Sequence, residues 1–408
     1  MKLKNLFSIG KKSVEVIDTP ERLQAEILGD IASSSGQAVT TQTAMQLSTL
    51  FGCVRVLAES VGMLPCKLYS GDGRERSVAR GHWLHQLLHV APNSFMTPQD
   101  FFEFLVACLC LRGNFFARKV VVRGEVRELL PLNPAAVKVK MKDWTICFEV
   151  RCEDGKLETL TEKEIFHIRL FSLDGITGVN PIRYNREAIG LALGAQEQGN
   201  RWFSNGVTTT GVLKTEQRLT DDAFNRLRQD LKTRNVGTSN AANPLILEMG
   251  LDWRNLSVNA EDVQFLETRK FQRDEICAIY RVPPHMVANL ERATFSNIEH
   301  QGLSFVSNTL VPYLTRIEQK IRTNLIPAVE RSEYFAKFNV AALLRGDLKA
   351  RYDSYSTGIN WGILSPNDCR ANEDLNPRDG GDIYLTPINM TTKPEAVSNE
   401  PKNDRDAA

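Results

Sequence analysis

The stretch RVPPHMVANLERATFSNIEHQ, residues 281–301, joins two segments that both have the pattern of long helices. Pro283 and Pro284 end the first helix, because proline has no backbone N–H and its ring clashes with the preceding turn. Ser296 and Glu299 match the capping box, which predicts the start of the second helix. The pattern therefore predicts a short loop held between two well-defined helix ends.

The two helices that flank this loop differ in character. The preceding segment, 259–282, is rich in charged residues, and its basic residues include Arg269, Lys270 and Arg273. The following segment, 296–327, repeats apolar residues at helical spacing. Pro312 lies inside it and predicts a kink.

A third long helix is predicted over 180–206, where Asn180 provides the cap, Pro181 the first position and Gly206 the end. The middle of this helix has little side-chain bulk, and its small residues are Gly190, Ala192, Gly194, Ala195 and Gly199. Such a stripe allows close packing against a strand of the same chain. It equally allows another helix, for instance from an identical subunit, to approach closely, so both interpretations stay open.

Between the helices 180–206 and 259–282 the sequence predicts a small β–α–β–β insert over 207–258. TTGVLK reads as a strand, Thr220 caps a helix, and PLILEMG with LDWRNLSV reads as a hairpin. The helix of the insert carries a basic set, Arg226, Arg228, Lys232 and Arg234. A solvated face with local ion pairs explains each of these cations taken singly.

The region 44–179 is predicted to be an α+β domain. Helices are expected over 43–65, 82–93 and 97–120, the last with Thr97 as its cap. Short alternating runs from Lys119 onward predict an antiparallel sheet. Residues 1–43 are expected to be partly flexible, 328–386 to hold one or two shorter helices, and the polar tail 387–408 to be disordered. The whole chain is thus predicted to be α+β and mainly helical.

The composition limits the classes of partner. The chain has 408 residues with 50 basic and 49 acidic side chains, a formal net charge of +1, so it cannot hold nucleic acid by overall charge. Its eight cysteines include no CxxC pair, which favours a reduced, intracellular environment. No apolar run approaches the roughly 18 residues of a membrane span, and we expect no membrane association.

The usual catalytic motifs, a phosphate loop, GxSxG and HExxH, do not occur in the sequence. One cluster allows an alternative: His82, His85 and His89 have a spacing that would place them on one helical face, as a metal-dependent nucleic-acid enzyme would need. Trp83 and Leu84 belong to the apolar face of the same helix, so the histidines read better as its polar side. We therefore predict no metal, no cofactor and no enzyme activity.

Taken together, the order of these parts resembles the portal proteins of tailed bacteriophages, in the branch typical of long non-contractile tails. The resemblance covers about Ala44 to Thr386. It is carried by the order and spacing of the stretches HWLHQLLHVAPNSFMTPQDFFEFLVACLCLRGNFFARK, RGEVRELLPLNPAAVKV, GVNPIRYNREAIGLALGAQEQGNRWFSNG, QFLETRKFQRDEICAIYRVPPHMVA and SNIEHQGLSFVSNTLVPYLTRIEQKI.

The resemblance implies a division of the chain into the parts of a portal subunit. In chain order these would be a wing (44–179), a stem helix (180–206), a clip (207–258), a second stem helix (259–282), a tunnel loop (283–295), a long kinked wing helix (296–327) and a reduced crown (328–386).

The function implied is that of a ring, dodecameric in the virion, at one capsid vertex. Double-stranded DNA would pass through it during packaging and ejection, without sequence preference. Its partners would be the terminase large subunit, the major capsid protein and head-completion or tail adaptor proteins, with assembly in the host cytoplasm. The resemblance assigns Asn289, Arg292 and Thr294 to DNA contact in the tunnel loop. Another head–tail adaptor protein is a further alternative. The length of the chain and its plan, a pair of long helices with an insert between them, count against this alternative.

Overall fold

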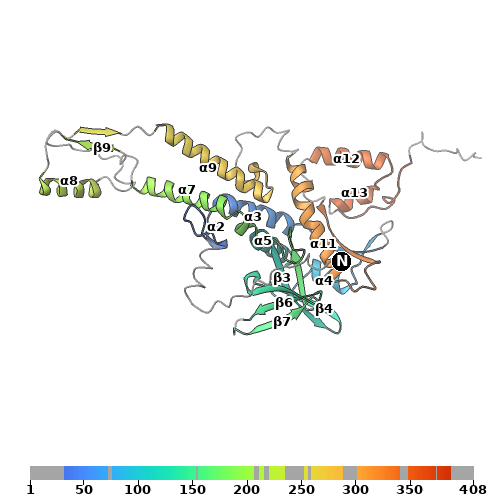
Figure 1. Cartoon of the computed structure of the whole chain (residues 1–408). Coiled ribbons are helices and arrows are strands. Elements are labelled where there is room, and N and C mark those ends of the chain that lie inside the picture. The colour runs from blue at the N-terminus through green and yellow to red at the C-terminus, as the bar shows by residue number, and fades with distance from the viewer. Residues whose placement is uncertain are drawn as a thin grey trace, which may run out of the picture. The chain divides into compact units, whose positions relative to one another are not determined.

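The computed structural model of the chain describes residues 32–71, 76–152, 155–205, 211–215, 220–234, 252–255, 259–287, 301–340, 348–373 and 375–386 (Figure 1). The chain divides into two compact units, Met1–Asn339 and Val340–Ala408.

The first unit contains both helices and sheets. Its α-helices are α2 (Thr41–Ala44), α3 (Ser48–Gly62), α4 (Trp83–His89), α5 (Pro98–Arg112), α6 (Pro181–Tyr184), α7 (Arg186–Asn205), α8 (Asp221–Arg234), α9 (Asn259–Tyr280) and α11 (Val311–Asn324). Its 3-10 helices are η1 (Pro134–Ala136) and η2 (Pro284–Val287), and a π-helical turn, η3, spans Phe305–Leu310. Its strands are β1 (Cys66–Ser70), β2 (Ser77–Val78), β3 (Asn114–Val122), β4 (Glu125–Leu132), β5 (Val137–Lys142), β6 (Thr145–Arg151), β7 (Leu157–Thr161), β8 (Ile165–Arg169), β9 (Gly211–Lys214), β10 (Asp252–Asn255) and β11 (Tyr334–Phe338).

Helices α3 and α5 pack against each other at the centre of this unit. The buried face of α3 includes Leu50, Val54, Leu57 and Val61, which recur at helical spacing within the helix predicted over 43–65. Helix α5 begins at the predicted cap. The Thr97 hydroxyl oxygen accepts a hydrogen bond from the backbone N–H of Asp100, and the Asp100 carboxylate accepts one from the backbone N–H of Thr97.

The end of α5 corrects the prediction of a helix over 97–120. The helix stops at Arg112, because Gly113 takes a left-handed conformation with φ 74°. Glycine is the residue that adopts this conformation without steric cost. The following residues, Asn114–Val122, form strand β3 instead of another turn of helix.

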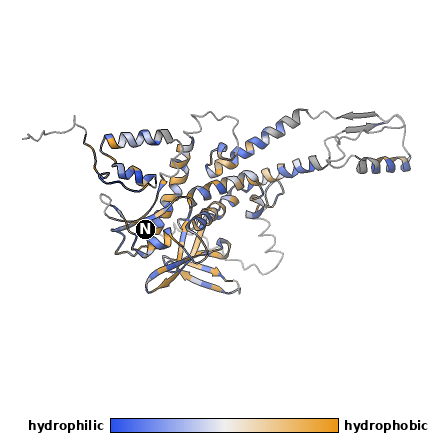
Figure 2. Ribbon diagram, turned by 180° about the vertical axis from the view of Figure 1, so that it is seen from behind, coloured by the Kyte–Doolittle hydropathy of each residue, from blue (hydrophilic) through white to orange (hydrophobic). Residues whose placement is uncertain are grey.

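The antiparallel sheets predicted after α5 are present as two three-stranded sheets, ordered β4-β3-β8 and β5-β6-β7. Figure 2 shows that hydrophobic and hydrophilic residues alternate along their strands. The inward-facing residues form one cluster, made of Phe116, Phe148, Val150, Leu160 and Ile165. This cluster joins the two sheets into one β layer.

A third sheet has the order β11-β1-β2. Its strands β1 and β2 pair antiparallel, with Tyr69 opposite Val78. Strand β11 pairs along the whole of β1 and was missed. It lies within 328–386, where short helices were expected, and its alternating pattern covers only five residues.

The long helix expected over 180–206 is interrupted. The Asn180 side chain caps its start as predicted, accepting from the backbone N–H groups of Ile182 and Arg183. Helix α6 then ends at Tyr184, and Asn185 leaves the helical conformation with ψ 24° before α7 begins. Helix α7 packs alongside α9, so the two long helices form a pair (Figure 1).

The small-residue stripe of α7 is covered by a segment of the same chain. A Cβ placed on Gly190 would lie 2.2 Å from the Ser33 hydroxyl oxygen, and Gly194 faces Ser35 and Gln37. The backbone N–H of Ser34 donates to the Glu187 carboxylate at 2.9 Å. Close packing within the chain therefore explains this part of the stripe. The covering segment is not one of the named strands; it runs from Ala32 to Ala38, and these two residues form an isolated antiparallel β-bridge.

The kink predicted at Pro312 takes the form of a π-helical turn. Pro312 lacks the N–H that an α-helix needs at that position, and its ring opposes a carbonyl in the preceding turn. The turn before it, η3, widens to the i to i+5 pattern, and α11 then begins at Val311. The described part of the predicted helix thus consists of residues 301–304, η3 and α11.

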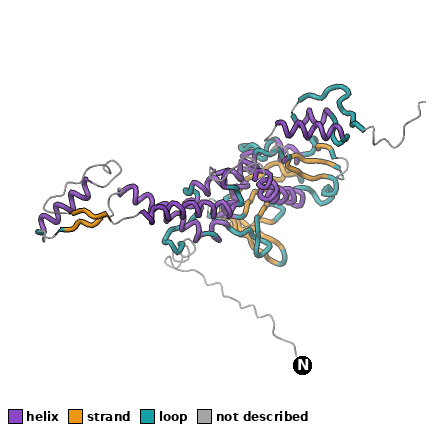
Figure 3. Tube along the Cα trace, turned by 90° about the horizontal axis from the view of Figure 1, so that it is seen from above, coloured by secondary structure: helices purple, strands orange, loops and turns teal. Residues whose placement is uncertain are grey.

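The insert contains α8, which begins directly after Thr220 as predicted. Strand β10 pairs antiparallel with β9, with Trp253 opposite Leu213 (Figure 3). PLILEMG, predicted to be the first strand of a hairpin, lies outside the described residues.

The second unit contains α12 (Leu348–Asn360) and α13 (Pro366–Asn372), which confirms the expectation of short helices there. Ser365 and Asp368 form a capping box at the start of α13. Arg351 of α12 forms an ion pair of 2.6 Å with Glu373, which fixes the two helices to each other. Of the described helices in either unit, none is both long enough and apolar enough to cross a membrane.

Candidate nucleic-acid interface

The predicted DNA-contacting residues, Asn289, Arg292 and Thr294, lie outside the described residues, as does the predicted capping box of Ser296 and Glu299. The structure describes the chain on both sides of them, up to Val287 and again from residue 301. The geometry of these two ends shows how the segment between them is attached.

The entry side is a tightly closed helix end. Arg281 has φ 53°, and the backbone N–H of Val282 donates to the Cys277 carbonyl oxygen at 3.0 Å. This six-residue closure is a Schellman motif, in which an arginine occupies the position that glycine prefers. Pro283 then follows, and Val287 packs against Gly52 of α3, where an added Cβ would come within 3.1 Å of it.

The exit side is bonded directly to the entry side. The Thr309 hydroxyl in η3 donates to the carbonyl oxygen of Arg281 at 2.7 Å. Phe305 and Leu310, in the same turn, are buried. The two ends of the segment between them are therefore held together by a specific hydrogen bond and by burial.

A buried polar network lies beneath this junction and joins α9 and α11 to α3 and α5. The Tyr280 hydroxyl donates to the Cys110 carbonyl oxygen at 3.3 Å, and the Cys110 thiol lies 3.8 Å from the Tyr313 hydroxyl. Burial raises the pKa of the Cys110 thiol to about 12 and raises the pKa of Tyr280. Cys53 also hydrogen-bonds Cys277, which raises the pKa of the Cys53 thiol. Raised pKa values keep Cys53, Cys110 and Tyr280 protonated and neutral at physiological pH, so these three groups add no buried charge to the junction.

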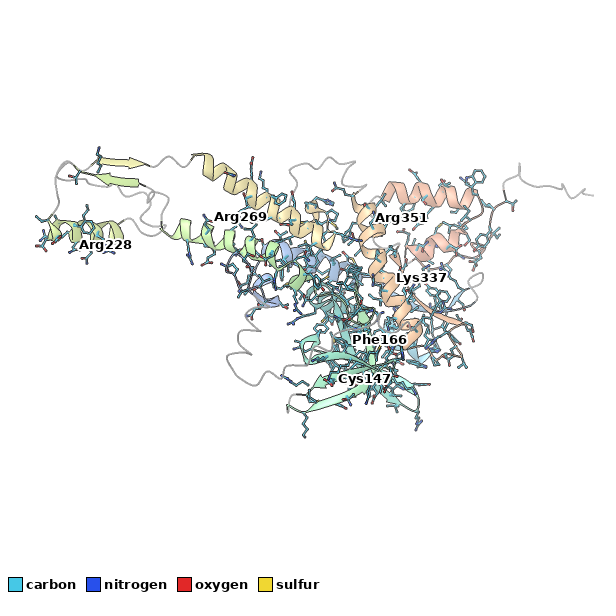
Figure 4. All side chains as sticks on the ribbon, viewed as in Figure 1. Cys147, Phe166, Arg228, Arg269, Lys337 and Arg351 are labelled. Carbon is cyan, nitrogen blue, oxygen red and sulfur yellow. The ribbon has the colours of Figure 1, made fainter. Side chains whose placement is uncertain are left out.

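The predicted basic residues of the long helices do not form one cluster. Arg269 (Figure 4) is exposed on α9, and so is Lys270. Arg273 is half-buried, and its Nε has no hydrogen-bond partner among the described atoms. On α8, Arg226 and Arg228 are exposed. Lys232 and Arg234 lie on the same helix, but their side chains are outside the described part of the chain.

The histidine cluster predicted as an alternative metal site is not formed. His82 is not on the helix but caps it: its Nδ1 accepts from the backbone N–H of Leu84 at 3.1 Å. Its Nε2 therefore carries the proton in the neutral ring and donates to Glu330 at 3.2 Å. His85 and His89 contact each other, and burial lowers the pKa of both. Among the described residues, no three His, Cys, Asp or Glu side chains are placed to hold a metal ion.

A second polar feature was missed by the sequence analysis. A cavity of about 600 Å³ in the first unit is lined by Arg80, Arg123 and Arg127, together with His82 and Trp83. Arg123 and Arg127 belong to the hairpin of β3 and β4, whereas Arg80 comes from the segment before α4, which is distant from them in the sequence. The available signal was the Arg123–Gly124 pair in a two-residue hairpin turn, where asparagine or aspartate would be expected in place of arginine.

Taken together, these features define an α+β protein in which two paired helices, α7 and α9, flank a small inserted unit, and in which the end of α9 is hydrogen-bonded to η3. The family model of phage portal proteins matches residues 48–374. The chain is 30% identical over 376 residues to the portal protein of Enterobacteria phage HK97, covering 90% of this chain and 88% of that protein. The chain therefore belongs to the phage portal protein family.

Other similarities agree with this assignment. The probable portal protein of Streptomyces phage phiC31 is 31% identical over 378 residues, covering 89% of this chain and 82% of that protein. The fold is similar to that of a chain in the neck of a native gene transfer agent particle, with a TM-score of 0.57 and 21% identity over 87% of this chain and 100% of the other. The predicted α+β portal fold is thereby confirmed.

Proposed function

We propose that this chain is the structural subunit of a ring, dodecameric in the virion, that occupies one vertex of the capsid. The observation that carries the proposal is membership of the portal family over residues 48–374. A gene transfer agent neck that was computed with C12 symmetry contains a chain of this fold, and this supports the subunit number. We assign the subunit no catalytic activity, metal or cofactor of its own.

Each part of the chain has a role in this ring. We assign the wing to 44–179, the stem helices to 180–206 and 259–282, the clip to 207–258, the tunnel loop to 283–295, the kinked wing helix to 296–327 and the crown to 328–386. The packing of α7 against α9 supports the assignment of a stem pair.

The ring passes double-stranded DNA inward during packaging and outward during ejection. Asn289, Arg292 and Thr294 of the tunnel loop contact the phosphates without reading sequence. Each phosphate contact adds affinity through counterion release, so a single arginine in each loop suits a channel through which DNA slides. The hydrogen bond from Thr309 to Arg281 supports this role, because a loop that touches moving DNA needs fixed ends.

The outer parts of the ring bind proteins. The clip, with Arg226, Arg228, Lys232 and Arg234, faces the terminase large subunit during filling and the head-completion or tail adaptor proteins afterwards. The stem cations Arg269, Lys270 and Arg273 contribute positive charge to the ring, and the wing lies next to the major capsid protein. The subunits assemble in the host cytoplasm and remain in the virion.

The tunnel-loop assignment is tested with the double variant Asn289→Ala/Arg292→Ala in the infecting phage. We expect rings to assemble normally and DNA packaging or retention to fall, while Arg151→Ala, an exposed arginine on β6, leaves both unchanged. Wild-type packaging and retention in the double variant would show that this loop is not the constriction. The metal-enzyme alternative has no support in the geometry, since His82 points to Glu330 and away from His85 and His89.

A further inference from the structure

The cavity lined by Arg80, Arg123 and Arg127 has the composition of an anion-binding site. Its volume of about 600 Å³ lies within the range of ligand pockets in proteins. Three separate segments form it: the residues that lead into α4, the turn between β3 and β4, and the chain after α11 near Pro327 and Glu330. None of its residues belongs to the predicted tunnel loop, stem or clip.

The ion pairs within this cavity leave the guanidinium groups of Arg80 and Arg123 available to bind a ligand. Arg127 is paired with Glu125 at 2.7 Å, and His82 bonds to Glu330. Within the described part of the chain, no carboxylate lies at ion-pair distance from Arg80 or Arg123. Both side chains are exposed, so their guanidinium groups can reach a ligand in the cavity.

Arg123 holds an unfavourable backbone conformation in this position. It has φ 55° and Gly124 has φ 86°, and Val122 pairs with Glu125, which makes the connection a two-residue type I′ turn. Asparagine, aspartate or glycine occupy the first position of such a turn at lower cost than arginine. Local folding therefore does not explain the arginine, and strain of this kind is found where a side chain has another role.

We propose that this cavity binds an acidic segment of another protein, with carboxylates paired to Arg80 and Arg123. Arginine presents a planar fork that matches a carboxylate through two parallel hydrogen bonds. Trp83 and Pro327 supply apolar wall beside these cations, which suits a peptide that alternates acidic and apolar groups.

The shape of the site favours a peptide over nucleic acid. A DNA duplex is too wide to enter a concavity of about 600 Å³, and its closely spaced phosphates would meet Glu125 and Glu330 in the same wall. A flexible protein segment can insert single side chains between these acidic groups.

The test measures the binding of a fluorescein-labelled hexaglutamate peptide to the full-length chain by fluorescence anisotropy at low ionic strength. We expect saturable binding that added salt weakens. Arg80→Ala and Arg123→Asn should each weaken it about tenfold, the factor that one charge-assisted hydrogen bond carries. Arg80→Lys should restore part of the loss, and Arg151→Ala, outside the cavity, should bind like the wild type.

Two variants give results that nonspecific charge effects would not. Glu125→Gln frees Arg127 from its ion pair and should tighten peptide binding severalfold. Arg123→Asn should unfold at no lower urea concentration than the wild type while it loses affinity, because asparagine suits the turn better.

The proposal is overturned if the two arginine variants bind like the wild type, or if Arg151→Ala loses as much affinity as they do. It is also overturned if inorganic phosphate or a short DNA duplex displaces the peptide at equal charge concentration. Loss of ring assembly in Arg80→Ala, with no peptide binding by the wild-type ring, would mean that a second copy of this chain fills the cavity. The peptide measurement needs no ring, so its failure would leave the proposed portal function unaffected.

Discussion

The Thr309 hydroxyl donates a hydrogen bond of 2.7 Å to the carbonyl oxygen of Arg281, so the turn η3 is bonded to the end of helix α9, on the two sides of the proposed tunnel loop. The two residues are 28 positions apart in the chain. This bond therefore ties together the two ends of the chain between which residues 288–300 lie.

Thr309→Val keeps the shape of the side chain and removes the donor. We expect the free energy of unfolding to fall by about 1 kcal/mol, the net value of a hydrogen bond whose acceptor loses its partner. Thr309→Ser keeps the hydroxyl and should restore most of this loss. Urea unfolding of the three proteins measures the effect, and equal stability of the valine variant and the wild type would mean that the bond does not hold the loop.

Gly113 and Gly178 lie backbone against backbone. A Cβ on Gly113 would lie 2.0 Å from the Val179 carbonyl oxygen, and a Cβ on Gly178 would lie 2.0 Å from the Gly113 carbonyl oxygen. Neither backbone can move freely, since Leu170 also bonds to Gly113 at 2.9 Å. We expect Gly113→Ala to destabilise the protein by about 3 kcal/mol or more, through overpacking and left-handed strain together.

Gly175 provides the matched control for this effect. It has φ 73°, close to that of Gly113, but nothing lies within 4 Å of its added Cβ. Gly175→Ala should therefore cost only about 1 kcal/mol, the strain of the left-handed conformation. Similar losses for the two alanine variants in urea unfolding would show that the close contact contributes nothing.

His167 makes the stability of the β layer sensitive to acid. The side chain is 3% exposed, stacks on Phe116 with ring centroids 4.5 Å apart, and bonds Asn114. Burial is the main cause that lowers its pKa to about 3. The neutral ring therefore contributes stability above the unfolded pKa near 6.5, and this contribution is lost as the pH falls from 6.5 toward 3.

From this shift we expect the free energy of unfolding to fall by about 2 kcal/mol between pH 7 and pH 5 on account of His167 alone. His167→Gln removes the titration and should flatten the dependence on pH by that amount, although it lowers the stability at pH 7. His85 and His89, whose pKa values are also lowered by burial, should contribute in the same direction. An unchanged slope in the glutamine variant would contradict the burial of a neutral ring.

Trp144 occupies the second position of the turn between β5 and β6 with φ 62°, and it is 93% exposed. Glycine is preferred at that position of a type I′ turn. The residue before it, Asp143, suits the first position, so the substitution would create the favoured Asp-Gly pair. Trp144→Gly should raise the free energy of unfolding by about 1 kcal/mol, because strain is relieved and almost no packing is lost. A destabilised glycine variant in thermal unfolding would show that the indole contributes packing that its exposure does not reveal.

The sequence predicted best where local chemistry decides the structure. Thr97 and Asn180 cap their helices as expected, since short polar side chains satisfy the first backbone N–H groups of a helix. The helical face of α3 and the antiparallel sheets also follow from their spacing. The family resemblance, which is carried by the order of many such segments, is confirmed over most of the chain.

Prediction failed where a partner distant in the chain decides. Strand β11 is stabilised by β1, which comes more than 260 positions earlier, and its own pattern is short. Gly113 is itself a helix stop signal, but apolar residues continue on both sides of it, and its close contact with residues 178 and 179 exists only in the folded chain. The Arg80 and Arg123 cavity was missed for the same reason, because it exists only after three separate segments have packed together.

The central claim is that identical subunits of this chain close into a ring around a channel. Electron microscopy of the purified full-length protein tests it most directly. We predict ring-shaped particles with an open central pore, whose twelvefold form is recovered from the virion. Compact single subunits, or assemblies without a pore, seen both in the purified protein and at the vertex of filled particles, would contradict the account.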